Sequence, residues 1–246
     1  MPDFELRIVP ASINIRAGTI MPLTVYALRK DGFSDDITLK LKDPPKGFTL
    51  SGAWIPAGQD KIRLTLAAPA DAPAKPADLH VEGYAKINGQ EVCKQAVPSE
   101  DMMQAFFYRH LVPVQEQTVF GVKRDWVKPP PSLVSEKSVK IPTGGTARVE
   151  FVTSSKATTN QFSLELSEPP DGISIKEVSV KENVVAVELQ AEAGKVKPGL
   201  KGNLIINAFS MKKPEFKKGK TKPTKTDNSK FFMGSLPAVP FEIVSQ

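Results

Sequence analysis

Residues that could perform catalysis are sparse in this sequence. It has two histidines, and only His110 has a serine and acids nearby, Ser99, Glu100 and Asp101. A serine hydrolase needs a serine, a histidine and an acid within hydrogen-bonding distance, a strained nucleophile turn and an oxyanion site. No Gly-x-Ser-x-Gly sequence supplies that turn. His80 lies in an alternating segment and is expected to face solvent. We therefore predict no catalytic residue and a protein that is not an enzyme.

Metal-ligating patterns are equally scarce. Cys93 is the only cysteine, so neither an internal disulfide nor a cysteine-based zinc site can form. We expect its side chain to be a small buried apolar group. Asp31, Asp35 and Asp36 surround a loop glycine but lack the glutamate and the spacing of an EF-hand loop. We therefore predict a solvated turn there, and neither a metal nor a cofactor.

Lysine is the one charged residue type that clusters. Residues 212–230 contain eight lysines and two acids, an excess of six that equals the formal net charge of the whole chain, +6. One interpretation is a flexible, solvated loop tip. The other is a site for a polyanion such as an acidic glycan or phospholipid headgroups, with binding that weakens in salt. Nucleic acid is unfavoured because the loop has no arginine and one aromatic residue. The candidate binding residues are Lys212, Lys213, Lys217, Lys218, Lys220, Lys222, Lys225 and Lys230.

A second candidate contact region is rich in methionine and aromatic residues. We predict that Met102, Met103, Tyr108 and Trp126 contact a partner protein or join the two halves of the chain. Trp126 lies near a proline-rich segment and is expected to pack between the halves. The neighbouring pair Phe106-Phe107 matches Phe231-Phe232 in the second half, and we expect one residue of each pair to pack in the core.

Strands must position these residues, because apolar and polar residues alternate along most of the first half. The 22 prolines and 16 glycines suit short strands joined by turns, and Asn88-Gly89 is a strong signal for a two-residue hairpin. No stretch has a clear helical period. The pattern predicts an antiparallel β-sandwich. The alternating segments are residues 4–9, 12–16, 23–28, 37–41, 62–66, 79–87 and 113–122.

The second half of the sequence repeats the first. Residues 37–48 and 162–173 each contain an alternating strand, an acid, two prolines, any residue, a glycine and a large apolar residue, at an offset of 125 residues. Apolar residues continue to match at this offset as far as Leu236 and Val239, which match Leu111 and Val114. A slip of one residue would turn the apolar face of a strand outward. The repeat therefore predicts two copies of one sandwich.

The boundary between the copies is predicted at three consecutive prolines, which favour an extended spacer. We expect one sandwich over residues 1–124, a Pro-rich linker over residues 125–132 and a second sandwich over residues 133–246. No apolar run of about 18 residues suggests a transmembrane helix. The start of the sequence has no signal-peptide pattern, which predicts either a cytosolic protein or a piece of a larger exported chain.

The order of these elements resembles the bacterial immunoglobulin-like modules that occur in tandem in large exported proteins, often beside protease or carbohydrate-active domains. The similarity lies in the first strands and their glycine turns, the Pro-Pro-x-Gly elements and the Ala/Pro-rich segment 69–76, and residues 100–113 resemble part of one such module. The resemblance implies an all-β fold of two tandem immunoglobulin-like antiparallel β-sandwiches joined by a short Pro-rich linker. It also implies an exported parent, placed in the periplasm, on the cell surface or outside the cell.

The leading functional hypothesis is a non-enzymatic structural or interaction module, a spacer or protein-contact segment of a larger exported or cell-envelope bacterial protein. Its partners would be other domains of that parent, or envelope proteins and glycans. The alternative is a carbohydrate- or polyanion-binding module that uses the Lys-rich loop 212–230. The aromatic residues available to stack on a sugar are Tyr26, Tyr84, Tyr108, Trp54 and Trp126.

Overall fold

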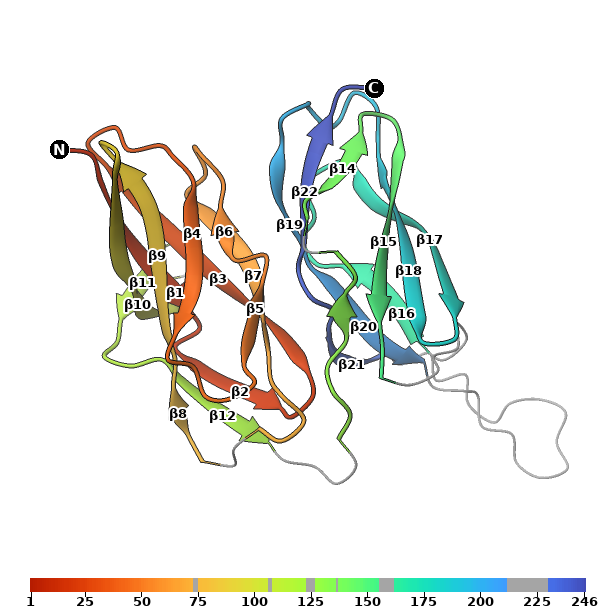
Figure 1. Ribbon diagram of the computed structural model, residues 1–246, viewed down its shortest axis with the longest axis horizontal. Coiled ribbons are helices and arrows are strands. Elements are labelled where there is room, and N and C mark those ends of the chain that lie inside the picture. The colour runs from red at the N-terminus through yellow and green to blue at the C-terminus, as the bar shows by residue number, and fades with distance from the viewer. Residues whose placement is uncertain (73–74, 106–107, 123–126, 136, 155–161, 212–229) are drawn as a thin grey trace, which may run out of the picture.

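The protein is an all-β chain, as the sequence predicts. The computed structural model describes residues 1–72, 75–105, 108–122, 127–135, 137–154, 162–211 and 230–246, and these ranges contain strands and turns but no helix (Figure 1). Within the same ranges there is consequently no helix with the length and apolarity needed to cross a membrane.

The first half contains strands β1 to β12, which form one large sheet and one small sheet. The large sheet has the order β5-β7-β3-β1-β10-β9-β4-β6, with β11 attached to β10, and the small sheet has the order β2-β12-β8. The strands are β1 (Asp3–Val9), β2 (Ser12–Arg16), β3 (Ile20–Lys30), β4 (Ile37–Lys42), β5 (Thr49–Ser51), β6 (Trp54–Ile55), β7 (Lys61–Ala67), β8 (Ala77–Asp78), β9 (His80–Ile87), β10 (Gln90–Gln104), β11 (Tyr108–Pro113) and β12 (Thr118–Val122).

Alternation along these strands builds the core of the first half. Successive side chains of a strand point to opposite faces, so Phe4, Leu6 and Ile8 of β1 all lie in the interior. They share one apolar cluster with β3 and β7 on one side and with β4 and β9 on the other. The large sheet therefore folds over on itself to supply both layers of a sandwich.

The second half contains strands β13 to β22 in three smaller sheets. Their orders are β13-β15-β18-β17, β14-β22-β19 and β16-β20-β21. A separate apolar cluster, which includes Phe151, Leu189 and Phe241, fills the space between them. The strands are β13 (Ser132–Leu133), β14 (Val139–Pro142), β15 (Thr146–Val152), β16 (Phe162–Leu166), β17 (Ile173–Lys181), β18 (Val184–Ala191), β19 (Lys201–Leu204), β20 (Ile206–Met211), β21 (Lys230–Ser235) and β22 (Val239–Val244).

The two Pro-Pro-x-Gly elements have the same backbone geometry. Each follows a matched strand, β4 or β16, and the acid before the prolines has a left-handed φ, 43° at Asp43 and 49° at Glu168. The glycine that ends the element is also left-handed, with φ of 84° at Gly47 and 82° at Gly172. A Cβ at Gly47 would lie 2.7 Å from the Pro69 side chain, and one at Gly172 would lie 2.6 Å from the Lys195 side chain, so the element needs its glycine in both halves. The sequence repeat is therefore also a structural repeat at this point.

The predicted offset fails at the last strands. In the matched parallel pairs, Ile13 faces Val119 and Val139 faces Phe241, and Phe241 lies 122 residues after Val119 rather than 125. Leu236 and Val239 are core residues, but Leu111, which was matched to Leu236, lies on β11 outside the core. The match of Leu111 to Leu236 is wrong because β10 and β11 of the first half form a hairpin, which comes before the last strand and changes the residue offset.

Two further burial predictions are wrong. Cys93 is exposed rather than buried, because β10 turns it to the outer face of the sheet opposite Tyr84. Phe231 and Phe232 are 48% and 51% exposed rather than in the core, because β21 lies at the edge of its sheet and, among the described strands, pairs only with β20. The matching pair Phe106-Phe107 lies outside the described residues.

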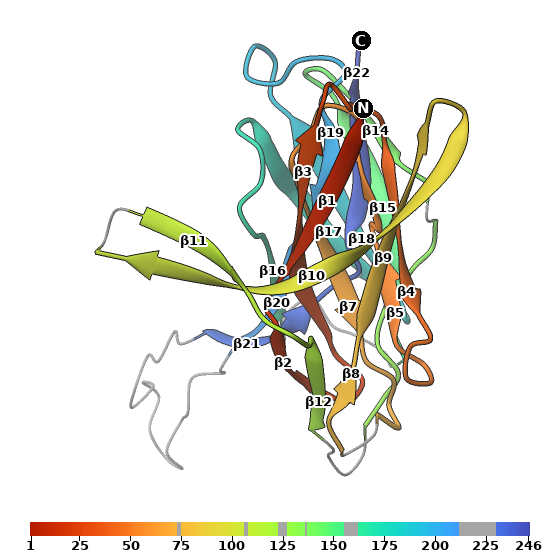
Figure 2. The same ribbon diagram turned by 90° about the vertical axis from the view of Figure 1, so that its left-hand side faces the viewer.

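The two halves lie side by side, and both chain ends lie at the same end of the molecule (Figures 1 and 2). Strand β7 contacts β19, and β3 contacts β21. Hydrogen bonds cross the interface: the Asn203 side-chain amide donates to the carbonyl oxygens of Gly52 and Arg63 at 2.7 and 2.8 Å. The Arg63 guanidinium donates to the carbonyl oxygen of Ser167 at 2.7 Å. The halves are therefore joined by specific polar contacts as well as by the chain.

Candidate functional site

A β-hairpin projects from the body of the first half (Figure 2). Strand β10 runs parallel to β1 as far as Pro98 and then pairs with β11 alone, from Ser99 opposite Pro113 to Gln104 opposite Tyr108. Strand β10 has fifteen residues, whereas its neighbours in the sheet, β1 and β9, have seven and eight. The extra length holds the ribbon away from the sheet, and it carries three of the candidate contact residues.

The two faces of this ribbon differ. Directly opposed residues share a face, and the register pairs Met102 with His110 and Asp101 with Leu111. The Asp101 face is turned toward the body at this pair, since the Asp101 side chain is 24% exposed and Leu111 is half-buried, whereas Tyr108 on the other face is 68% exposed. Burial raises the pKa of Tyr26 on β3, and the Asp101 carboxylate adds to this rise. Asp101 also forms an ion pair with Arg109 at 3.5 Å.

The opposite face, which we name the outer face, carries Met102, Tyr108, His110 and Val112, together with Glu100 and Gln104. Met102 and Tyr108 are 56% and 68% exposed, and the Tyr108 and His110 rings stack with centroids 6.5 Å apart. Met103 is also exposed but lies on the face with Asp101 and Arg109. The structure thus brings Met102 and Tyr108 together on one exposed surface and places Met103 on the other face.

The serine, acid and histidine of the hairpin do not form a triad. Ser99 is fully buried and its hydroxyl donates to the Val97 carbonyl oxygen at 3.2 Å. Asp101 and His110 lie on opposite faces of the ribbon, so neither can orient the other. His80 is exposed, as predicted, with its Nδ1 atom 3.2 Å from the Gln95 amide nitrogen. In the part of the chain that the structure describes, no three His, Cys, Asp or Glu side chains are placed to hold a metal ion.

Of the predicted lysine site, the structure describes Lys230. It begins β21 and forms an ion pair with Glu165 on β16. Next to it along β21, Phe231, Phe232 and Met233 are half exposed, which the sequence prediction missed. The remaining predicted residues lie outside the part of the chain that the structure describes: Lys212, Lys213, Lys217, Lys218, Lys220, Lys222, Lys225 and Trp126.

An ion-paired cluster lies on the solvent-exposed side of the large sheet, over β4, β9 and β10. The Tyr84 hydroxyl donates to the Glu82 carboxylate at 2.6 Å, and Lys42 pairs with the same carboxylate at 2.9 Å. The hydrogen bond raises the pKa of Tyr84 above its ordinary value and, together with Lys42, lowers the pKa of Glu82. The Lys40 ammonium lies 4.8 Å from the Tyr84 ring centroid. These contacts stabilise the sheet face, and they assemble no hydrolytic site.

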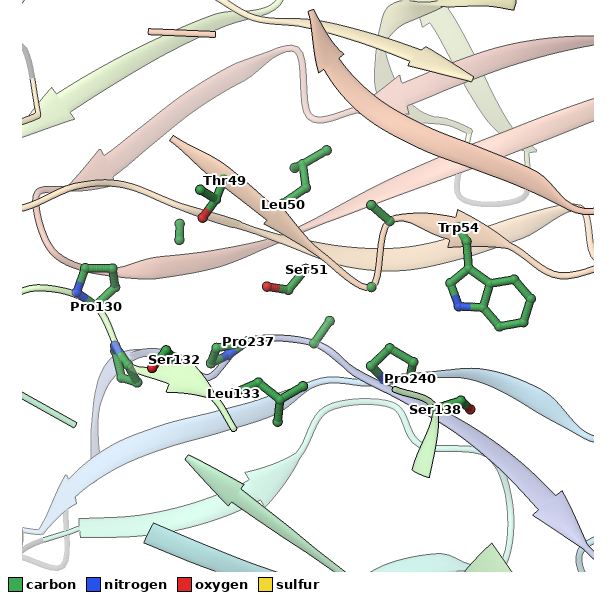
Figure 3. Close-up of a pocket in the computed structure, with 15 residues that line it drawn as sticks. Thr49, Leu50, Ser51, Trp54, Pro130, Ser132, Leu133, Ser138, Pro237 and Pro240 are labelled. Atoms are coloured by element: carbon green, nitrogen blue, oxygen red, sulfur yellow. The ribbon is translucent and has the colours of Figure 1, made fainter. Parts of the chain in front are cut away.

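A groove of about 640 Å³ runs between the two halves and was not predicted (Figure 3). We name it the Trp54 groove. One wall is the segment 49–54 of the first half with Ala67, and the other is formed by residues 130–133, at the end of the linker and the start of the second half, with Ser138, Pro237, Ala238 and Pro240. None of the fifteen lining residues is charged. The only sequence signal was Trp54 itself, since the walls come from segments far apart in the chain.

Comparisons with known proteins give structural likenesses of low score. No family model matches the chain, and no curated protein matches it. Domains 4–9 of the surface layer protein SbsC align over 100% of this chain and 32% of theirs, with 12% identity and a TM-score of 0.34. This chain thus spans about a third of the length of that six-domain segment. SbsC domains 4 and 5 align over 99% of this chain and 98% of theirs, with 14% identity and a TM-score of 0.28.

A marsupial T cell receptor aligns over 84% of this chain and 94% of its own, with 12% identity and a TM-score of 0.27. At these scores and identities, none of the three likenesses assigns the chain to a family. Its all-β fold follows from its own strands.

Proposed function

We propose that this chain is a non-enzymatic contact module of a larger exported, cell-envelope bacterial protein. It consists of two tandem immunoglobulin-like sandwiches, over residues 1–124 and 133–246, with a linker over residues 125–132. The observation that carries the proposal is the outer face of the β10–β11 hairpin, where Met102 and Tyr108 lie exposed beside His110 and Val112. The resemblance of the strand and turn pattern to exported bacterial modules supports the compartment.

The hairpin has the properties of a surface that a partner covers. A two-stranded ribbon is marginally stable in water unless something packs on it. Among the strands that the structure describes, β11 pairs only with β10, so its other edge presents backbone groups that no described strand pairs and to which a partner strand could add. Methionine and tyrosine are favoured contact residues. The methionine side chain is flexible and adapts to a partner's surface, and the tyrosine side chain presents a large apolar ring with a polar hydroxyl at its end. A protein partner would cover both the edge and the outer face.

The arrangement of the halves favours a contact role over a spacer role. Both chain ends lie at the same end of the molecule (Figures 1 and 2). The halves are held side by side by hydrogen bonds such as that from Gln59 to the Lys201 carbonyl oxygen at 2.6 Å. A folded-back pair adds little length between its ends, so it serves better to present a surface than to extend a stalk.

Site-specific photo-crosslinking tests the proposal. A benzoylphenylalanine at position 108 is expected to capture a defined protein when the full chain is incubated with the cell-envelope fraction of the source cells. The matched control carries the same group at Val134, which is 56% exposed and lies in the second half, where its backbone N–H donates to the Glu150 carbonyl oxygen. Addition of Met102→Ser to the position-108 variant should reduce the adduct. Equal adducts at both positions would contradict the proposal.

The second candidate function, polyanion binding, has its own observation: the lysine excess of residues 212–230 equals the net charge of the whole chain. Heparin retention should fall when four of these lysines become glutamine and should weaken steeply with salt. Four exposed lysines elsewhere provide the control, and an equal loss in both variants would sink this function. The test set is Lys217, Lys218, Lys220 and Lys222, and the control set is Lys46, Lys86, Lys137 and Lys181.

A further inference from the structure

We infer that the Trp54 groove is a binding site for a neutral saccharide. The groove has a volume of about 640 Å³, within the range of sites that hold small ligands. It runs from Pro130 at one end to Trp54 at the other, with Ser51 on one wall and Pro237 on the facing wall (Figure 3). This site is separate from the hairpin and shares none of its residues.

The chemistry of the lining selects the class of ligand. The fifteen described residues that line it include no acid, lysine, arginine or histidine, so these described walls offer no counter-charge to a phosphate, a carboxylate or an ammonium group. Burying such a charge without a partner is costly, so a charged ligand is selected against. Four hydroxyl groups line the groove and can exchange hydrogen bonds with an uncharged, hydroxyl-rich molecule. They belong to Thr49, Ser51, Ser132 and Ser138.

Trp54 provides the apolar contact that a sugar ring needs. The indole is half-buried at the end of the groove, with its nitrogen-bearing edge toward Pro240 and Ser138 (Figure 3). An indole combines a large apolar face with one N–H donor, which suits a ring that has C–H groups on its faces and hydroxyls at its rim. Pro240 faces it from the second half, and Pro237 adds rigid apolar surface further along the groove, opposite Ser51 (Figure 3).

The groove is pre-formed, because hydrogen bonds between the halves fix both walls. Gly52, on one wall, accepts the Asn203 amide at 2.7 Å. Ala238, on the other wall, donates its backbone N–H to the Thr65 hydroxyl at 2.8 Å. Because these hydrogen bonds already hold both walls in place, the walls lose little conformational entropy when a ligand enters. Pre-organisation of this kind lowers the free-energy cost of binding.

Tryptophan fluorescence tests the inference. The chain has two tryptophans, so a Trp126→Phe background makes Trp54 the sole reporter. We would titrate this protein with cellohexaose, N-acetylchitohexaose and maltohexaose, and with a heparin hexasaccharide as the charged comparison. At least one neutral hexasaccharide should give a saturable change with a Kd of about 1 mM or lower. That change should persist at about 0.5 M NaCl, where binding to a lysine surface is screened.

Variants then locate the site. Calorimetry on the chain with its native Trp126 should show that Trp54→Ala raises the Kd about tenfold or more, that Ser138→Ala raises it less, and that Trp54→Phe retains part of the affinity. Met102→Ser, on the hairpin, should leave it unchanged, which keeps this test independent of the proposed partner contact. Circular dichroism checks that each variant is folded. Absence of any signal from the neutral sugars, or unaltered affinity in Trp54→Ala, would overturn the inference.

Discussion

Thr65 couples the two halves through a buried hydrogen bond, and its removal should weaken the protein measurably. It occupies an outward position of β7 yet is only 1% exposed, and its hydroxyl accepts the Ala238 backbone N–H at 2.8 Å. Thr65→Val keeps the shape of the side chain and removes the acceptor. The Ala238 N–H, fully buried, then has no partner. A buried unsatisfied donor costs about 1–3 kcal/mol, so we expect the free energy of unfolding to fall by about 2 kcal/mol.

Equilibrium urea unfolding at neutral pH measures this loss. Far-UV circular dichroism follows the strands, and the transition midpoint and slope are compared between variants. Thr65→Val should lower the midpoint and leave the slope of a single transition unchanged. If the halves unfold separately, the variant should instead move the two transitions apart, because the contact that couples them is lost.

Two variants decide whether the hydrogen bond is responsible. Thr24→Val makes the same change on the neighbouring strand β3, at a half-buried outward position beside Arg63 with no side-chain hydrogen bond in the described part of the chain. It should change stability by less than about 0.5 kcal/mol. Thr65→Ser keeps the hydroxyl and should retain most of the coupling. Equal effects of Thr65→Val and Thr24→Val would refute the reasoning.

Three further outcomes are expected. Gly83→Ala should destabilise the chain by about 1–3 kcal/mol in the same unfolding assay, because its Cβ would lie 2.4 Å from the Leu6 side chain. The control Gly202→Ala, whose nearest ring carbon would be 3.4 Å away, should be better tolerated. Glu82→Gln should lower the pKa of Tyr84 in an absorbance titration, since the carboxylate that raises it is gone. Because the pKa of Glu82 is lowered below 4.5, its contribution to stability is present above that pH and is lost on acidification, so Glu82→Gln should flatten the acid limb of the pH–Tm curve.

Local features of the fold were predictable because short-range rules control them. The Asn88-Gly89 hairpin forms as predicted, with positive φ of 52° and 80° at its two residues. Alternation correctly placed Leu64 and Leu189, which match at the predicted offset, in the two cores. Each of these predictions depends on residues adjacent in the chain or on a period of two.

Predictions that depended on neighbouring strands were less successful. Cys93 lies in a clear strand, but whether its face is covered depends on what packs beyond the sheet. Leu111 matches a core residue by offset, yet the extension of β10 carries its partner strand off the body. The sequence marked Met102, Met103 and Tyr108 as contact residues, but composition and spacing do not specify how far a strand continues past the core, so the sequence did not place these residues on a projecting hairpin.

The sequence by itself determined the all-β character, the repeated Pro-Pro-x-Gly turns and the positions that face inward, because proline, left-handed glycine and alternation act within a few residues. Only the tertiary structure decided which outward positions are covered. Thr65 is polar and outward on its strand but is buried because the second half packs on β7. The Trp54 groove joins residues 49–54, 130–133 and 237–240, and its existence depends on the contact of two folded surfaces, which no local pattern specifies.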